Sequence, residues 1–334
     1  MGGSDSSGAG QTLSFVRNLE GETVFIHFGI EPPIDKNDFP GLGCSMSQIL
    51  LRDGRTLDLL DNHHTSDTAV VFHHGTPGNS TSWRQWIDQL SGSDLTAFAA
   101  SRPGYGQSER LRGRRVVDVV DDLAQVLDQR EIAKFVSVGW SGGGPHALAM
   151  SLDPRCVGVI SLAGVGQYGT PDLDFLAGMG PENIEEFTIA DEGEAPLREW
   201  MNLNAVGMQQ ATGSGLRAAF GGLIGKADTE VLAGDFAEDM AAGFRRALSH
   251  GFDGWIDDDL AFVQEWGFDL SAINIPVFLW QGNDDFMVPH THSRWLASKI
   301  PTAQLNFIPE NGHISLIVKH RDEIVTQLQQ LIAP

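Results

Sequence analysis

Ser141 is the residue whose neighbours point most directly to chemistry. It lies in the run Gly139-Trp140-Ser141-Gly142-Gly143, which follows an apolar segment and precedes a helix-like one. This G-x-S-x-G pattern is typical of a sharp turn from a strand into a helix, with the serine at its apex. Glycines suit such a turn because the strained backbone leaves little room for flanking side chains. The spacing therefore predicts a nucleophilic hydroxyl, with the Gly142 backbone N–H directed at an oxyanion near the helix N-terminus.

A second oxyanion donor is expected from a turn upstream. There an apolar run ends in His74-Gly75-Thr76-Pro77-Gly78, a tight turn of the kind that presents a backbone N–H to an oxyanion. We expect Thr76 to be that donor. We expect His74 to orient the loop by hydrogen bonding.

Candidate acid and base residues follow further along the chain, each after an apolar, strand-like run. One run leads into a polar loop with the paired carboxylates Asp284 and Asp285, and a later run leads to His313. Asp285 is the preferred acid, and Asp284 stays open as the alternative. In a serine hydrolase His313 would remove the Ser141 proton, while the carboxylate would hold the imidazole tautomer and stabilise the imidazolium.

The chain order Ser…Asp…His, together with the upstream turn, resembles the α/β-hydrolase superfamily. The resemblance runs from about residue 47 to the C-terminus and includes residues 101–108, which are similar to the turn after that family's fourth strand. In family members with a G-x-x-D-x-x-V-P loop the acid lies three residues after the glycine, and counting from Gly282 gives Asp285. The resemblance implies an α/β fold with a mostly parallel central sheet, helices on both faces and an inserted helical lid.

The hydrophobic pattern predicts the elements of such a core. Apolar runs at residues 48–51 and 56–60 flank an Asp-Gly turn and predict a β-hairpin. Residues 95–100 and 135–139 indicate central parallel strands, and residues 116–123 open an amphipathic helix between them.

The same pattern divides the chain into parts. We expect a flexible tail over residues 1–12, a hydrolase core over 13–165 and 269–334, and a helical lid over 166–268. Residues 13–45 form an N-terminal extension of the core. The extension suggests an extra strand pair, but we find no match to it in the superfamily.

Aromatic and methionine side chains are the candidates for an apolar acyl pocket. We name Trp140, Trp200, Met208 and Phe286 as substrate-binding candidates. Lid residues of this kind more often belong to the lid's own core, so the set carries more weight than any single member.

Metal and nucleotide chemistry are not indicated. His290 and His292 form a His-x-His pair without a cysteine cluster or a His-Glu-x-x-His helix, and glycines 142–144 lack the Gly-Lys-Ser/Thr ending of a P-loop. We expect the acidic run at residues 257–259 to lie near a helix start as a solvated cap, and we assign it no calcium. We therefore expect no metal and no cofactor.

The composition of the chain limits the classes of partner that we expect it to bind. The 334 residues include 44 acidic and 22 basic ones, a net charge of −22, which argues against binding to nucleic acid. Cys44 and Cys156 are too few for a disulfide framework, no export signal is visible, and no apolar run approaches the roughly 20 residues of a membrane helix. We expect a cytoplasmic protein with a small-molecule acyl substrate and no nucleic acid or membrane partner. Its oligomeric state stays open.

The type of nucleophile limits the classes of reaction that we expect. The related haloalkane dehalogenases and epoxide hydrolases place an aspartate where this chain has Ser141, and a serine with a general base suits acyl carbons instead. We expect hydrolysis of a small or medium carboxylic ester or lactone through an acyl-enzyme.

Three alternatives remain open. A proline-iminopeptidase-like aminopeptidase is favoured by the turn at residues 74–78 and by the acidic lid, but that family usually has a tryptophan after the serine, whereas Trp140 precedes it. A slow or non-catalytic ligand receptor on the same fold is the second. The third is a cofactor-free perhydrolase.

Overall fold

The computed structural model describes residues 15–17, 23–25 and 43–332 of the chain. Near the N-terminus, β1 (Phe15–Arg17) pairs antiparallel with β2 (Thr23–Phe25), as expected for the extension. This strand pair belongs to a unit separate from the compact unit of residues 42–334, which contains the site. The tail expected over residues 1–12 lies outside the described residues.

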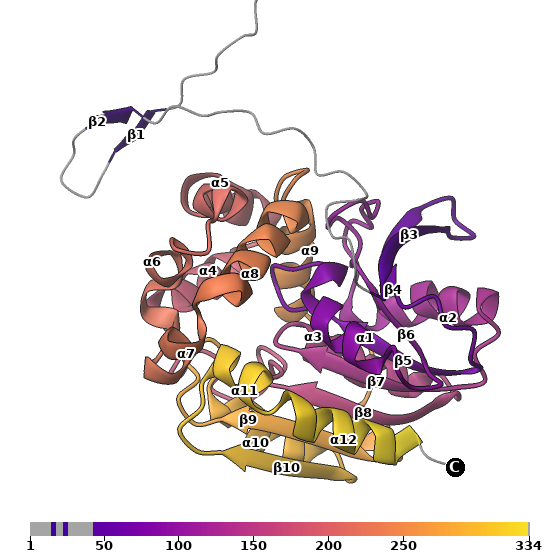
Figure 1. Ribbon diagram of the computed structural model, residues 1–334. Helices are drawn as coiled ribbons and strands as arrows, with labels where there is room; N and C mark the ends of the chain where they lie inside the picture. Colours follow the sequence, from indigo (N-terminus) through magenta and orange to yellow (C-terminus); the bar gives the residue numbers. More distant parts are fainter. Residues whose placement is uncertain (1–14, 18–22, 26–42, 333–334) are drawn as a thin grey trace, which may run out of the picture. The chain divides into compact units, whose positions relative to one another are not determined.

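An eight-stranded mixed sheet forms the centre of the compact unit (Figure 1). Its order is β10-β9-β8-β7-β5-β6-β4-β3, with β5 to β10 parallel, and with β4 antiparallel to both β3 and β6. The strands are β3 (Ser45–Leu50), β4 (Thr56–Asp61), β5 (Thr68–His73), β6 (Thr96–Ala100), β7 (Lys134–Trp140), β8 (Cys156–Leu162), β9 (Val277–Gly282) and β10 (Ala303–Ile308). The hairpin and the two central strands predicted from the sequence are all present, and the α/β fold class is confirmed.

Helices cover both faces of this sheet (Figure 1). Side chains alternate along a strand, so Ala69 and Val71 of β5 pack in one core cluster with α2, α3 and α10, while Val70 and Phe72 pack in the other with α1 and α12. These helices and their neighbour α11 are α1 (Arg84–Leu90), α2 (Val119–Gln129), α3 (Gly143–Ala149), α10 (His290–Lys299), α11 (His313–Lys319) and α12 (Arg321–Ile332). Short 3₁₀ segments are η1 (Ser80–Trp83), η2 (Val116–Asp118), η3 (Met150–Leu152) and η6 (Leu270–Ala272).

A helical insertion lies between β8 and β9, in the part of the sequence that predicts a lid, and we call it the lid below. Figure 1 shows its helices gathered together beside the sheet. They are α4 (Pro181–Glu192), α5 (Glu194–Asn204), η4 (Val206–Gln210), α6 (Leu216–Phe220), η5 (Gly221–Leu223), α7 (Lys226–Val231), α8 (Gly234–Ala247) and α9 (Asp253–Phe262). The boundaries 166 and 268 stay a prediction.

The acidic run at residues 257–259 corrects one expectation. α9 begins at Asp253, so the run lies in mid-helix, and its three side chains are buried rather than solvated. Two of the three have basic partners from distant parts of the chain: Asp257 pairs with Arg110 at 2.7 Å, and Asp258 pairs with Arg102 and Arg114, each at 2.6 Å. A buried carboxylate persists where such partners are supplied, and helix position alone does not predict them.

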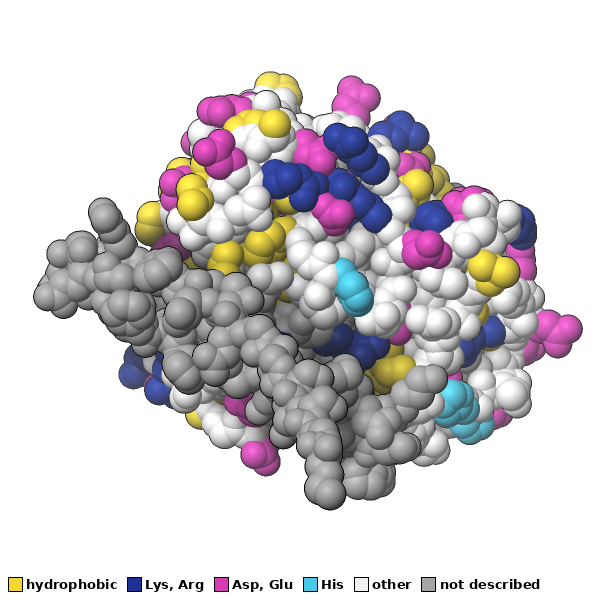
Figure 2. Space-filling view, turned by 90° about the horizontal axis from the view of Figure 1, so that it is seen from above, with side chains coloured by type: hydrophobic (Ala, Val, Ile, Leu, Met, Phe, Trp, Pro, Cys, Tyr) yellow, Lys and Arg dark blue, Asp and Glu magenta, His cyan; other side chains and the backbone are white. Residues whose placement is uncertain are grey.

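Acidic and basic side chains lie next to one another on the face seen in Figure 2. Ion pairs at the surface include Arg112 with Glu194 at 2.6 Å and Lys299 with Asp172 at 2.5 Å. The visible face is therefore mixed in charge, although the whole chain carries a net charge of −22.

His292 is a buried imidazole that the fold keeps neutral. Its Nδ1 accepts the Gly166 N–H at 2.9 Å, so its Nε2–H donates to the Phe175 carbonyl, also at 2.9 Å. Burial lowers the pKa of His292 to about 4, although the hydrogen bond to Phe175 and the charge of Asp285 act in the opposite direction.

Replacing His292 should change how stability depends on pH. Between the unfolded pKa near 6.5 and the folded pKa of about 4, the unfolded chain binds a proton that the folded chain does not. Stability is therefore lost as pH falls through this window, by about 1.4 kcal/mol per pH unit for this residue. We expect His292→Gln to reduce the slope by that amount in urea unfolding at pH 7, 6 and 5. Equal slopes for the two proteins would show that His292 is not neutral in the fold.

Candidate active site

Ser141 sits in a strained turn at the carboxyl end of β7. Its φ is +58°, a left-handed conformation that serine rarely adopts. The turn is held by hydrogen bonds from the Ser141 N–H to the Leu162 carbonyl and from the Gly144 N–H to the Ser141 carbonyl, both 2.9 Å. This geometry matches the turn that the G-x-S-x-G spacing predicts, with α3 starting two residues later.

Two glycines of the motif are required by close backbone contacts. A Cβ on Gly139 would lie 2.1 Å from the Gly143 carbonyl oxygen, and a Cβ on Gly143 would lie 2.2 Å from the His73 carbonyl oxygen and 2.6 Å from that of His74. These distances are far inside van der Waals contact. The strand, the turn and the helix can therefore approach this closely only without side chains at the two positions.

Gly143→Ala should destabilise the fold strongly. Overpacking commonly costs about 1–3 kcal/mol, and here two backbone carbonyls would have to move, so we expect a loss of at least about 3 kcal/mol. Urea unfolding measures the loss. Gly207→Ala in η4 is the matched control, because a Cβ there meets no atom within 4 Å. Equal stability of the two variants would contradict the packing described for the turn.

The upstream turn lies directly against the serine turn. A Cβ on Gly75 would lie 3.3 Å from Ser141 Cβ, and a Cβ on Gly142 would lie 2.3 Å from Thr76 Oγ1. The structure therefore brings the two predicted oxyanion donors, Thr76 and Gly142, together beside Ser141. Their role as donors stays a prediction.

His74 orients the upstream turn through both ring nitrogens. Its Nδ1–H donates to the Gly75 carbonyl at 2.7 Å, and its Nε2 accepts the Arg102 backbone N–H at 2.9 Å. Burial, reinforced by the charge of Arg102, lowers the pKa of His74 well below its usual value, so the ring is neutral. The Arg102 guanidinium donates to the carbonyls of His74 at 2.5 Å and Gly75 at 2.9 Å. This is the orienting role expected of His74, supported by an arginine that the sequence did not single out.

Asp285, rather than Asp284, faces the candidate base. Its Oδ2 lies 2.8 Å from His313 Nδ1, and its Oδ1 accepts the backbone N–H groups of Met287 at 3.0 Å and Val288 at 2.8 Å. The Asp284 carboxylate lies instead beside Gly225 of the lid, where an added Cβ would come within 2.3 Å of Oδ2. The contact fixes the His313 tautomer, since a carboxylate oxygen accepts the Nδ1 proton and leaves Nε2 as the acceptor.

His313 lies beside the serine turn. The Trp140 ring packs against the His313 ring, with centroids 5.2 Å apart, and Trp140 Nε1–H donates to the His313 carbonyl at 3.3 Å. Trp140 directly precedes Ser141. The three candidate residues therefore follow strands β7, β9 and β10 at the carboxyl edge of the sheet, where active loops of parallel sheets lie.

A lid carboxylate positions the helix that carries His313. Asp228 of α7 accepts the backbone N–H groups of His313 at 2.9 Å, Ile314 at 3.0 Å and Ser315 at 2.7 Å. These are the free N–H groups of the first turn of α11, which a carboxylate satisfies well. Sequence reasoning missed Asp228 because it lies 85 residues before His313 with no local motif.

The other substrate-binding candidates lie in different surroundings. Trp200 packs against the apolar cluster of α5 and α9, and Met208 packs against that cluster and a second lid cluster. Phe286 is partly exposed beside Asp285. Contact of Trp140, Trp200, Met208 or Phe286 with a substrate stays a prediction.

Two further features of the described residues bear on function. No helix in the described part of the chain has both the length and the apolar character of a membrane span. Within the same ranges, no three His, Cys, Asp or Glu side chains are grouped as metal ligands.

The chain belongs to the alpha/beta hydrolase fold family, whose sequence pattern matches residues 68–320. It is 31% identical over 173 residues to epoxide hydrolase B of Mycobacterium tuberculosis, covering 43% of this chain and 49% of that protein. It is 28% identical over 178 residues to a putative 2-succinyl-6-hydroxy-2,4-cyclohexadiene-1-carboxylate synthase of Bacillus subtilis, covering 51% of this chain and 63% of that protein. The chain thus spans about half the length of the first of these relatives and under two thirds of the second.

Solved structures share the fold. An esterase from Thermogutta terrifontis superposes with a TM-score of 0.61 at 20% identity, covering 86% of this chain and all of that one (100%). A bromoperoxidase from Bacillus anthracis superposes with a TM-score of 0.62 at 22% identity, covering 86% of this chain and 99% of that one. At such identities the likeness shows the fold alone.

Proposed function

We propose that this hydrolase cleaves a small or medium carboxylic ester or lactone through an acyl-enzyme on Ser141. The observation that carries the proposal is the 2.8 Å contact between His313 Nδ1 and Asp285 Oδ2, buried beside the turn that presents Ser141. This arrangement supplies a nucleophile, a base with a fixed tautomer and an orienting carboxylate.

Acylation proceeds in two stages. Ser141 Oγ bonds to the acyl carbon while its proton passes to His313 Nε2, and the carbonyl oxygen becomes an oxyanion held by the N–H groups of Thr76 and Gly142. The intermediate then collapses: the bond to the alcohol oxygen breaks, and that oxygen takes the proton from His313. The Asp285 carboxylate stabilises the imidazolium between these stages.

Deacylation repeats the sequence with water. The oxygen of a water molecule bonds to the acyl carbon while His313 takes a proton from that water. The second tetrahedral intermediate then forms, with its oxyanion in the same site. The bond to Ser141 Oγ then breaks, the proton returns to that oxygen, and the carboxylic acid leaves.

The serine also argues against epoxide opening, the reaction in the name of the Mycobacterium tuberculosis relative. Attack of Ser141 on an epoxide carbon would give an alkyl ether. An ether lacks the carbonyl that water attacks in an ester intermediate, so the enzyme would not be regenerated.

A second candidate function is an aminopeptidase that binds a substrate ammonium in the lid. Burial raises the pKa of both Glu186 and Asp259, and the neighbouring Glu186 adds to the effect on Asp259. Glu186 accepts the Trp255 Nε1–H at 2.5 Å, and its carboxyl group shares a side-chain hydrogen bond with that of Asp259. An ammonium group would satisfy such a carboxyl pair.

A substrate panel separates the candidates. The full chain is assayed with 4-nitrophenyl esters of graded chain length, a series of lactones, and proline 4-nitroanilide. We expect turnover of short esters or lactones at rates well above that of the anilide. A preference for the anilide would replace the proposal with the aminopeptidase. No turnover of any ester or lactone would overturn the proposal, and a ligand receptor on this fold would then take its place.

A further inference from the structure

Asp258 is a lid carboxylate without exposed surface that bonds to the upstream turn. Its Oδ2 accepts hydrogen bonds from Thr76 Oγ1–H at 2.6 Å, from Arg102 Nη2 at 2.6 Å and from the Tyr105 hydroxyl at 2.9 Å. The same Arg102 nitrogen lies 2.9 Å from the Gly75 carbonyl oxygen. One carboxylate on α9 therefore holds the side chain of Thr76 and also Arg102, which binds the carbonyl of the preceding residue, Gly75.

The charge of Asp258 is secured by its partners. Burial opposes ionisation, but the charges of Arg102 and Arg114 outweigh it and hold the pKa of Asp258 well below its usual range. α9 also reaches the serine turn itself, since a Cβ on Gly142 would lie 2.9 Å from Phe262 Cζ. This lid helix is thus in contact with both parts of the candidate oxyanion site.

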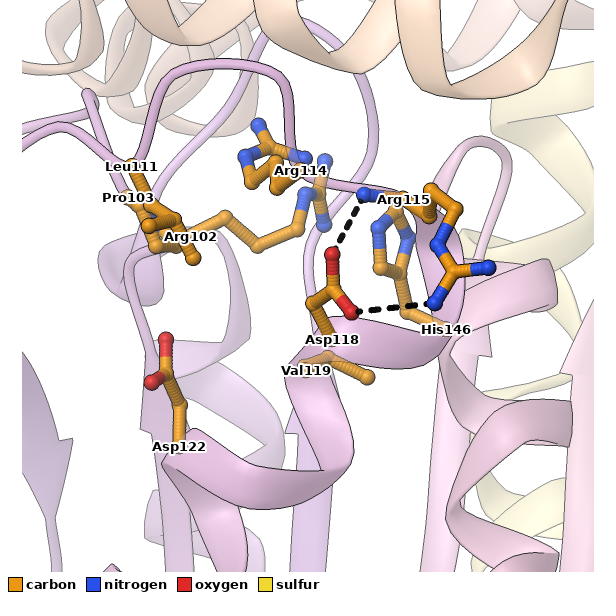
Figure 3. A pocket seen from close by; sticks show the side chains of 9 residues that line it. All are labelled: Arg102, Pro103, Leu111, Arg114, Arg115, Asp118, Val119, Asp122 and His146. Atoms are coloured by element: carbon orange, nitrogen blue, oxygen red, sulfur yellow. Dashed lines mark hydrogen bonds and ion pairs between the residues drawn. The ribbon is translucent and has the colours of Figure 1, made fainter. Parts of the chain in front are cut away.

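A second set of side chains, Arg114 and His146, lies between Asp258 and Gly142. Arg114 Nη2 donates to Asp258 Oδ1 at 2.6 Å. Arg114 and His146, a residue of α3, both line one small cavity of about 10 Å³ (Figure 3). In Figure 3 the side chain of Arg102 extends toward His146.

Some polar atoms that line this cavity have no hydrogen-bond partner among the described residues. His146 Nδ1–H donates to the Gly142 carbonyl at 2.8 Å, and burial, with the charge of Arg102, lowers the pKa of His146 well below its usual value. Its Nε2 is therefore a bare acceptor. Across residues 43–332, His146 Nε2 and the Arg114 donors Nε and Nη1 have no hydrogen-bond partner.

A water molecule in this cavity would satisfy these groups. It would accept from Arg114 and donate to His146 Nε2, and the cavity volume of about 10 Å³ is close to that of a single water site. A halide does not fit as well, because it would face the lone pair of His146 Nε2. Buried polar groups are rarely left unpaired, so a bound water is the expected state.

We propose that Asp258 is a positioning residue for the oxyanion site. It acts on Thr76 directly, and on Gly142 through Arg114, a buried water and His146. Asp258 touches no reacting atom, and its effect depends on where it holds the two backbone N–H donors. The inference rests on the proposed function, since it assigns the lid a part in forming the site that stabilises the acyl-transfer oxyanion.

Kinetics of Asp258→Asn test this inference, with Asp257→Asn as the matched control on the same helix. Asp257 pairs with Arg110 and lies outside the network. Misplaced donors lower transition-state binding more than substrate binding, so we expect kcat on 4-nitrophenyl acetate to fall about 10- to 100-fold with KM within about twofold. Activity is expressed per active site titrated with a fluorophosphonate. The control should keep both constants; equal kcat values for the two variants would overturn the proposal.

Thr76→Val provides a second test if Asp258→Asn does not fold. The variant loses the hydroxyl that donates to Asp258 but keeps the backbone N–H. We expect a smaller fall in kcat, about 3- to 10-fold, again without a change in KM. An unchanged kcat would overturn the direct arm, and a crystal structure without a water between Arg114 and His146 would overturn the second arm.

Amide hydrogen exchange distinguishes failure of this inference from failure of the proposed function. We expect exchange at Thr76 and Gly142 to be faster in Asp258→Asn than in the wild type and unchanged in Asp257→Asn. If the wild type neither hydrolyses esters nor reacts with the fluorophosphonate, the proposed function fails. The exchange comparison still decides whether Asp258 positions the two amides, and equal exchange in all three proteins would overturn that claim.

Discussion

Ser141→Ala lowers kcat for ester hydrolysis by at least about 10⁴-fold and leaves the fold intact. We expect a loss this large because the proposed covalent intermediate forms on this hydroxyl, and the candidate oxyanion donors alone would recover only a small part of the rate. Steady-state assays on the most active 4-nitrophenyl ester measure the change, with circular dichroism as the check on folding.

A matched control is Ser161→Ala on the neighbouring strand β8. Ser161 is buried, and its hydroxyl has no hydrogen-bond partner in the described ranges, so its removal should leave kcat within about twofold. Comparable activity of Ser141→Ala and wild type would show that another group is the nucleophile.

Asp285→Asn should cost about 10⁴-fold in kcat, whereas Asp284→Asn should change it only slightly. An asparagine at 285 would present an N–H₂ group or a neutral carbonyl to His313 Nδ1, and the correct tautomer and the stabilisation of the imidazolium would be lost. The Asp284 carboxylate lies beside Gly225 and makes no contact with His313 among the described residues.

The paired variants resolve the choice that the sequence left open. They are compared on one ester at one pH, after a check that both unfold at the same urea concentration as the wild type. A larger loss in Asp284→Asn than in Asp285→Asn would contradict the site described here.

The local parts of the site could be predicted from the sequence because each is encoded in a short segment. The serine turn follows from the spacing of Gly139 and Gly143, and the upstream turn from the order of His74, Gly75 and Thr76. Strand-to-loop transitions likewise indicate Asp285 and His313. In each case a few adjacent residues determine the backbone, and parallel strands then bring the loops to one edge.

The lid contacts could not be predicted in this way. Asp258 meets Arg102 across 156 residues, and Asp228 meets His313 across 85. Neither carboxylate lies in a motif, and Asp258 belongs to an acidic run whose helix position favoured a solvated cap. Only the packing of the lid against the core shows that the charges are buried and paired.

These contacts give the lid a direct connection to the site. Asp228 satisfies the first turn of the helix that carries His313, and Asp258 bonds to the turn that carries Thr76. The lid therefore contacts the elements that carry the candidate base and a candidate oxyanion donor. Displacement of the lid would remove partners from both.

Mapping the adduct of a fluorophosphonate on the full chain tests whether Ser141 is the nucleophile and His313 its base. We expect a single adduct on Ser141, formed much more slowly in His313→Gln because the base that removes the serine proton is lost. An adduct on a different serine, or labelling of His313→Gln at the wild-type rate, would contradict a catalytic unit of Ser141, His313 and Asp285.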